Sequence, residues 1–268
     1  MPLATLNADD VVRIHYALVE EFASSDNPID PPGVKSQSLL ESAVGRQHTS
    51  LGNTIKYPDP YSNAATLAYG ICCDHAFHNG NKRTSLVSLL VHLYKNRLSL
   101  AGVKERDLYN LVLAIAKHEV YRPSKARSRI PGRPATEDEI AGIADWIKDS
   151  AIPVKRGEYI LTYRELRKIL RHFGYELETP KGNSIDIVQV ETRRDLLRRE
   201  RVVRTRIANI DYPGEGETVA VRHLKYIRRR LKLSAEDGVD SDTFYGLGEP
   251  IDSFIVEHRG ILYKLASK

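Results

Sequence analysis

Cysteine, tryptophan and methionine are scarce in this chain of 268 residues, which has two, one and one of them respectively. The two cysteines, Cys72 and Cys73, are adjacent, and neighbouring cysteines rarely form a disulfide with each other. We therefore interpret them as small buried residues and expect a reducing, cytoplasmic setting. The sequence also lacks a signal peptide and any apolar run long enough to span a membrane, so no membrane partner is expected.

Charge is distributed unevenly along the chain. Residues 1–154 hold 17 basic and 17 acidic residues, residues 155–232 hold 20 and 11, and residues 233–268 hold 3 and 7. A single evenly charged surface would not give such blocks. Ile152-Pro153 is expected to end the preceding helix. Together with the charge pattern, it predicts a domain over residues 1–150, a basic domain over 155–232 and an acidic extension over 233–268.

The first domain has the pattern of a helical protein. Apolar periodicity predicts helices that end near Ala23, Asp74, Asn96, His118 and Ser150, with a short helix between the first two. Ser38 with Glu41, and Thr136 with Glu139, are spaced as capping boxes that open two of these helices. Residues 45–60 are irregular and favour a loop or hairpin, and residues 122–134 form a loop rich in arginine, serine and proline.

The second half changes to an α+β pattern. Thr162 and Glu165 are spaced as a capping box for a helix that Gly174 ends. Three alternating, β-branched stretches follow at residues 175–178, 185–191 and 202–210, and then a basic helix at 219–231. The short connections predict a small antiparallel sheet with helices.

The most informative segment is the run from His75 to Leu86. A histidine precedes a polar turn containing Gly80, and the turn leads into a helix that begins near Thr84. The free amides and positive dipole end of such a helix are a ready site for an anion, most often phosphate. Lys82 and Arg83 add positive charge there, so the segment indicates transfer of a phosphorus-centred group.

This run resembles the signature loop of the Fic/Doc (Fido) family, His-x-Phe-x-Asp/Glu-Gly-Asn-Gly/Lys-Arg, and the resemblance extends over residues 1–150. Lys82, where AMP-transferring members carry glycine, and Leu86, where they carry a second arginine, make the loop similar to the Doc branch. The resemblance implies a helical Fido domain with His75 as general base, Arg83 as catalytic phosphate clamp and Phe77 as the structural anchor of the loop. The nucleotide phosphates would be bound by Gly80, Asn81, Lys82, Arg83 and Thr84.

The resemblance implies a Doc-like toxin that transfers the γ-phosphate of ATP to a Ser or Thr hydroxyl of a protein, with a translation component as target. Residues 45–57 would be the flap that aligns the target. A cognate antitoxin or the acidic tail would control the site. Two alternatives stay open: a Fic-type nucleotidyltransferase that transfers AMP, and a weakly catalytic Fido scaffold that binds RNA or a protein partner.

The metal site departs from the family pattern. Asn79 stands where the family has an acidic ligand for Mg²⁺, and an asparagine oxygen coordinates without charge. Asn79 is therefore expected to bind Mg²⁺ weakly.

The basic domain resembles HicA-type toxins with a double-stranded-RNA-binding-like fold, but Asn183-Ser184-Ile185 lacks the catalytic histidine of that family. Its arginine clusters predict contact with RNA or the ribosome by phosphate neutralisation. The alternatives are a solvated basic surface and a surface for the acidic tail. The candidate nucleic-acid contacts are Arg193, Arg194, Arg198, Arg199, Arg228 and Arg229.

Overall fold

The computed structural model describes residues 3–100, 102–120, 135–154, 161–194, 200–239, 244 and 250–266, and the side chains of 135, 179, 193, 194, 200 and 235 are not included. The chain folds into two compact units. The first comprises Met1–Val154 and Glu257–Lys268, and the second comprises Lys155–Val256. Within the described ranges, no helix has the length and apolar character needed to cross a membrane.

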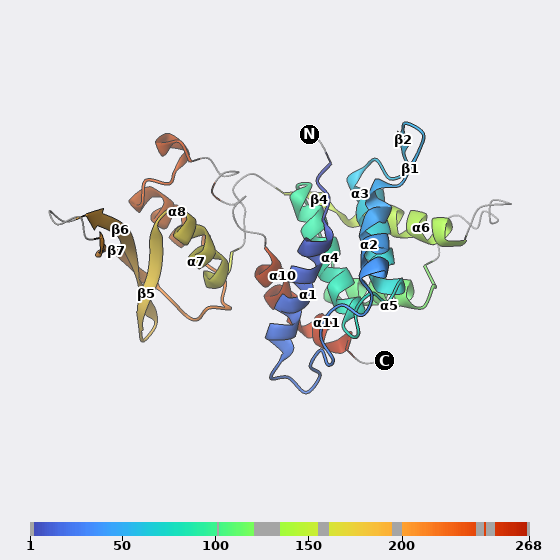
Figure 1. Cartoon of the computed structure of the whole chain (residues 1–268), viewed down its shortest axis with the longest axis horizontal. Helices are drawn as coiled ribbons and strands as arrows, with labels where there is room; N and C mark the ends of the chain where they lie inside the picture. Colours follow the sequence, from blue (N-terminus) through green and yellow to red (C-terminus); the bar gives the residue numbers. More distant parts are fainter. Residues whose placement is uncertain are drawn as a thin grey trace. The chain divides into compact units, whose positions relative to one another are not determined.

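The first unit is helical (Figure 1), as predicted. Its helices α3 and α4 are the most deeply buried, and the other helices surround them. Two short antiparallel pairs complete the unit: β1 (Ser50–Leu51) with β2 (Thr54–Ile55), and β3 (Leu98–Ser99) with β4 (Ile152–Pro153). The helices are α1 (Ala8–Phe22), α2 (Gln37–Gly45), the 3-10 turn η1 (Arg46–His48), α3 (Pro60–Cys73), α4 (Asn81–Lys95), α5 (Glu105–Ala116), α6 (Ala135–Ser150) and α11 (Arg259–Lys264).

Side-chain caps start three helices of the first unit: α1, α2 and α3. Asn7 caps α1 in a reciprocal capping box with Asp10. The predicted capping box at Ser38 and Glu41 is wrong, because the hydroxyl of Ser36 accepts the amide of Leu39 and starts α2 earlier. The irregular segment 45–60 contains the β1–β2 hairpin, and the predicted loop at 122–134 lies outside the described residues.

The second unit is a three-stranded antiparallel sheet with helices, as the α+β pattern predicted. Its order is α7 (Tyr163–His172), β5 (Tyr175–Lys181), β6 (Ser184–Arg194), β7 (Glu200–Asp211) and α8 (Val221–Arg230). The middle strand is β6, paired at Leu177↔Ile187 on one side and Ile185↔Ile210 on the other. Thr162 and Glu165 form the predicted capping box of α7, and Gly174 follows the helix with φ of 79°.

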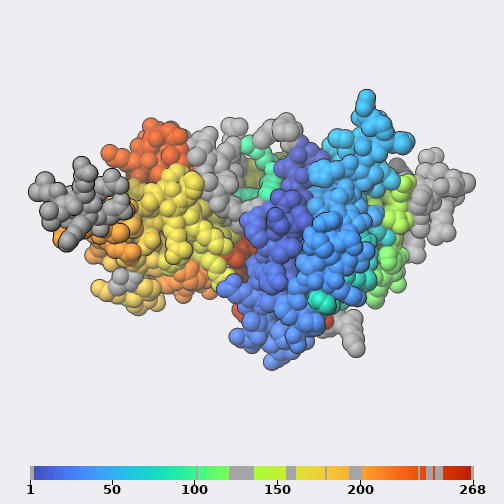
Figure 2. Space-filling view, viewed as in Figure 1, coloured from blue at the N-terminus to red at the C-terminus, as the bar shows by residue number. Residues whose placement is uncertain are grey.

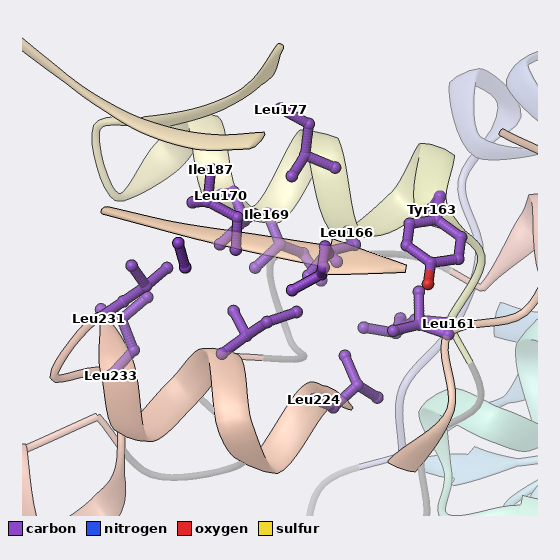
Figure 3. Packing of buried hydrophobic residues seen from close by; sticks show 14 of the residues in the cluster. Leu161, Tyr163, Leu166, Ile169, Leu170, Leu177, Ile187, Leu224, Leu231 and Leu233 are labelled. Carbon is purple, nitrogen blue, oxygen red and sulfur yellow. The ribbon is translucent and has the colours of Figure 1, made fainter. Parts of the chain in front are cut away.

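One apolar core holds the second unit together. Its residues come from α7, α8 and the inner face of the sheet, including Leu166, Leu177, Ile187 and Leu224 (Figure 3). Burial of such side chains stabilises the fold by roughly 1.5–3 kcal/mol each. Because the apolar residues of the sheet alternate along the strands, its other face is left for polar side chains.

Residues 233–268 are not a separate acidic extension. Phe244 is fully buried in the core of the second unit, and α10 (Ile251–Glu257) is tied to α7 through the buried carboxylate of Glu165. That carboxylate accepts the backbone amide of Ser253 at 3.1 Å and also its hydroxyl. The chain then returns to the first unit as α11, which contacts α5 and places Arg259 3.3 Å from Glu21 of the same unit.

Candidate active site

The signature loop, residues 74–80, connects the two central helices of the first unit. Gly80 is the N-cap of α4 with φ of 77°, a conformation that glycine adopts at little cost. A Cβ at this position would lie 3.0 Å from the side chain of Ile29, so the close approach also requires glycine. Within the described part of the chain, no side chain caps the first turn of α4. This turn therefore retains the capacity to bind an anion that the sequence predicted.

His75 is exposed at the start of this loop. Its φ of 52° is unusual for a residue with a side chain, and it turns the chain sharply after α3. Among the described residues, no group hydrogen-bonds its imidazole. The neighbouring Asp74 is half-buried, and burial raises the pKa of its carboxyl above the ordinary value. The histidine is thus open to a substrate hydroxyl, which is what a general base requires.

Phe77 is the structural anchor of the loop in this fold. It is buried and stacks on the ring of His15 in α1, with 4.1 Å between ring centroids and 16° between planes. His15 Nε2 accepts the amide of Gly33 at 3.0 Å, so its proton is on Nδ1, which lies 3.1 Å from Thr84 Oγ1. Burial, reinforced by Arg83, lowers the pKa of His15 to about 4, so the ring is neutral at neutral pH.

Asn81 and Thr84 face the protein rather than the solvent. The side-chain amide of Asn81 accepts from the backbone of Phe77 at 3.0 Å and donates back to its carbonyl at 2.9 Å. Thr84 is fully buried, and its hydroxyl is hydrogen-bonded to Nδ1 of His15. Sequence reasoning assigned both side chains to phosphate binding. In the structure they fix the shape of the turn.

Arg83 is also buried, with 1% of its surface exposed. Nη1 donates to the carbonyl of Asn27 at 3.0 Å, and the guanidinium lies 5.2 Å from the ring centroid of Phe22. Nε has no hydrogen-bond partner among the residues that the structure describes. Burial lowers its pKa to about 10. The side chain of Arg83, predicted to clamp phosphate, therefore points into the protein in this structure. The neighbouring cation Lys82, in the first turn of α4, is half-buried.

Asn79 does not present a ready metal ligand. Its side-chain oxygen accepts the amide of Gly80 at 2.6 Å, and its nitrogen donates to the carbonyl of Asp30 at 3.0 Å. In the parts of the chain that the structure describes, no group of three His, Cys, Asp or Glu residues could hold a metal ion. The residues present therefore do not fit a Mg²⁺ ion held by the protein alone.

The connection between α1 and α2 runs along the loop, and sequence reasoning did not identify this role. Asn27 and Asp30 accept hydrogen bonds from the loop through their carbonyls, Gly33 accepts the amide of His78 at 3.1 Å, and Ala76 accepts the amides of Lys35 and Ser36. In each of these hydrogen bonds, the group from the α1–α2 connection is a backbone amide or carbonyl. Side-chain patterns in the sequence therefore carry no signal for the contact.

A cavity of about 500 Å³ lies elsewhere in this unit. It is lined by the segment that follows the hairpin, the start of α3 and α6, including Lys56, Tyr57, Glu137 and Lys148. No residue of the signature loop lines it, so it is separate from the candidate active site.

The arginines predicted to contact nucleic acid differ in their surroundings. Arg228 is turned into its own unit, where Nε donates to the carbonyl of Leu233 at 3.0 Å, Nη2 donates to that of Val239 at 2.8 Å, and the guanidinium covers the ring of Phe244. Arg229 is exposed. The other candidates lie outside the described side chains: Arg193, Arg194, Arg198 and Arg199.

The histidine beside a glycine turn lies where the resemblance to the Fic/Doc family predicts it, and sequence comparison gives a match over the same region. Residues 5–93 match the Fic/DOC family, which supports a Fic/Doc (Fido) assignment for this part of the first unit. Over 69 residues it is 32% identical to Toxin Doc of Mycolicibacterium smegmatis. This match covers 26% of the chain and 53% of the relative, so the chain spans about half the length of that curated protein.

Proposed function

We propose that the first unit transfers the γ-phosphoryl group of ATP to a Ser or Thr hydroxyl of a protein. The observation that carries the proposal is the exposed His75 beside the uncapped first turn of α4. Lys82 favours phosphoryl transfer over AMP transfer, because it adds positive charge where AMP-transferring relatives carry glycine. A cation and helix amides together stabilise the charge on a transferring phosphoryl group.

In this mechanism, His75 takes the proton from the target hydroxyl. The hydroxyl oxygen then forms a bond to the γ-phosphorus, the bond from that phosphorus to the β,γ-bridging oxygen breaks, and ADP leaves. The α4 amides and Lys82 bear the charge on the phosphoryl oxygens. Since Asn79 does not fit a protein-held metal, no step is assigned to a metal bound by this chain.

The β1–β2 hairpin supports a protein as the acceptor. It projects from the surface of the first unit (Figures 1 and 2), and it exposes 88% of Leu51 and 53% of Ile55. Exposed apolar residues on a short strand pair are suited to pairing with an extended peptide segment. A protein segment aligned there would be the substrate.

The similarity to Toxin Doc supports a toxin and an antitoxin partner that controls it. A component of translation as the target is part of the proposal and does not come from that similarity. The second candidate is AMP transfer by the same loop, and the third is a binding scaffold. The buried guanidinium of Arg83 favours the scaffold. While Arg83 is buried and hydrogen-bonded to Asn27, it is not available to bind phosphate, and the site has one cation fewer.

Incubation of the full chain with a cell lysate and ATP labelled at the γ or the α position tests the proposal. Label transferred to protein from the γ position alone supports phosphoryl transfer. Label from the α position would instead establish AMP transfer, and no label from either position would leave the scaffold. An antitoxin partner is tested separately, by co-purification with the full chain from the native host.

A further inference from the structure

Carboxylates neutralise two arginines on the outer face of the sheet in the second unit. Arg204 of β7 is paired with Glu178 and lies 3.4 Å from Glu176, both in β5. Arg206 Nε lies 2.8 Å from a carboxylate oxygen of Asp186 in β6. The part of this face whose side chains the structure describes therefore presents alternating charges around Arg204 and Arg206 rather than a positive surface.

Three of the four Lys and Arg residues of α7 are paired in the same way. Lys168 and Arg164 lie 3.2 and 3.6 Å from the carboxylate of Asp252 in α10. Arg167 Nε donates to Glu215 at 2.9 Å. Of the acidic residues after position 232 that the structure describes, Asp252 thus compensates two cations of α7.

The outward face of α8 differs from both. Arg222, Lys225, Tyr226, Arg229 and Arg230 are exposed, and their spacing of i, i+3, i+4, i+7 and i+8 places them on one side of the helix. Among the described residues, no carboxylate lies within ion-pair distance of these four cations. The opposite side of the helix enters the core through Leu224, Ile227 and Leu231 (Figure 3).

We infer that this outward face of α8 binds the phosphate backbone of a nucleic-acid duplex. Unpaired arginines and a lysine along one helix face repel one another in solution, and phosphates relieve this repulsion and release their own counterions. Arginine presents a planar fork that matches two phosphate oxygens. Tyr226, 47% exposed at the centre of the face, adds an amphipathic ring that can pack against a sugar.

A duplex fits this unit better than a single strand. Proteins that bind single strands stack the bases on aromatic side chains, often on an open sheet. The three strands contain one aromatic residue, Tyr175, and it packs against the core. The phosphate backbone is therefore the feature of a nucleic acid that this unit is equipped to bind. RNA and DNA duplexes share that chemistry.

The test measures binding of the full chain to fluorescent 20-base-pair RNA and DNA duplexes by anisotropy, from 50 to 200 mM salt. The double variant Arg222→Gln/Arg229→Gln removes two charges from α8. The matched control, Arg204→Gln/Arg206→Gln, removes two ion-paired charges from the sheet of the same unit. Circular dichroism checks that both variants remain folded.

We expect the α8 variant to weaken duplex binding at least tenfold and the control to weaken it less than twofold. The slope of log K against log salt should fall by about two in the α8 variant, since each phosphate contact contributes about 0.9. Binding of either duplex in this manner supports the inference, and comparison of the two duplexes identifies the nucleic acid. Equal loss in both variants, no binding by the wild-type chain at 50 mM salt, or tighter binding of a single strand or of polyglutamate would overturn it.

Discussion

The pH dependence of stability gives a quantitative test of how the signature loop is supported. His15 is fully buried between Phe77, Thr84 and Gly33, and its pKa is lowered from 6.5 to about 4. The unfolded chain therefore takes up a proton at a higher pH than the folded chain does. The contribution of this histidine to stability is complete above pH 6.5 and is lost as the pH falls toward 4.

The size of the effect follows from the two pKa values. Between pH 7 and pH 5, His15 alone should lower the free energy of unfolding by about 2 kcal/mol, rising to about 3 kcal/mol at pH 4. The variant His15→Gln should lose this dependence. His92 is also buried, its pKa is likewise lowered to about 4, and its contribution remains in the variant.

The assay is urea unfolding at pH 7 and pH 5, followed by tryptophan fluorescence. Trp146 is the single tryptophan and lies in α6 of the first unit, so its signal reports the unfolding of that unit. His48→Gln controls for loss of a histidine at an exposed site. If His15→Gln retained the full pH dependence of the wild-type chain, the buried neutral His15 and the loop support built on it would be refuted.

Two further predictions concern helix packing and the metal position. A Cβ at Gly70 of α3 would lie 2.9 Å from Arg46 Cδ and 3.0 Å from Ala43 Cα, so Gly70→Ala should lower the free energy of unfolding by about 1–3 kcal/mol. Gly45→Ala, where nothing lies within 4 Å, is the matched control, and equal stability of the two variants would contradict the close packing of α2 on α3. Asn79→Asp places a charged oxygen beside the loop, so phosphoryl transfer should become faster and more dependent on Mg²⁺. A titration of the transfer rate with Mg²⁺ checks this, and an unchanged Mg²⁺ dependence would argue against position 79 as the metal position.

Local sequence signals predicted the start or end of a helix well where one residue type at one position determines it. Thr162 with Glu165 opens α7, and Gly174 follows that helix in a left-handed conformation. The alternating pattern of the three strands gave the antiparallel sheet. The sequence analysis placed the N-cap of α2 at Ser38, but the structure has it at Ser36. Both residues can cap a helix, and the choice depends on the hydrogen bonds that join the amides of Lys35 and Ser36 to the carbonyl of Ala76.

The sequence motif identified the residues of the candidate site, but it did not predict the orientation of several side chains. His75 is exposed, Gly80 has a positive φ and Phe77 is buried. Arg83 and Asn81 were assigned to phosphate, and they instead bind the carbonyl of Asn27 and the backbone of Phe77. Such contacts arise between segments more than fifty residues apart or through backbone groups, and a linear pattern of side chains does not encode them.

The role of His75 as general base is the central claim, and one measurement tests it directly. The rate of label transfer from γ-labelled ATP to protein is compared for the wild-type chain, His75→Ala and the neighbouring exposed control His78→Ala. Loss of a general base lowers such a rate by about 100-fold or more. We predict this loss for His75→Ala and a rate close to wild type for His78→Ala. Transfer by His75→Ala at the wild-type rate would contradict the account.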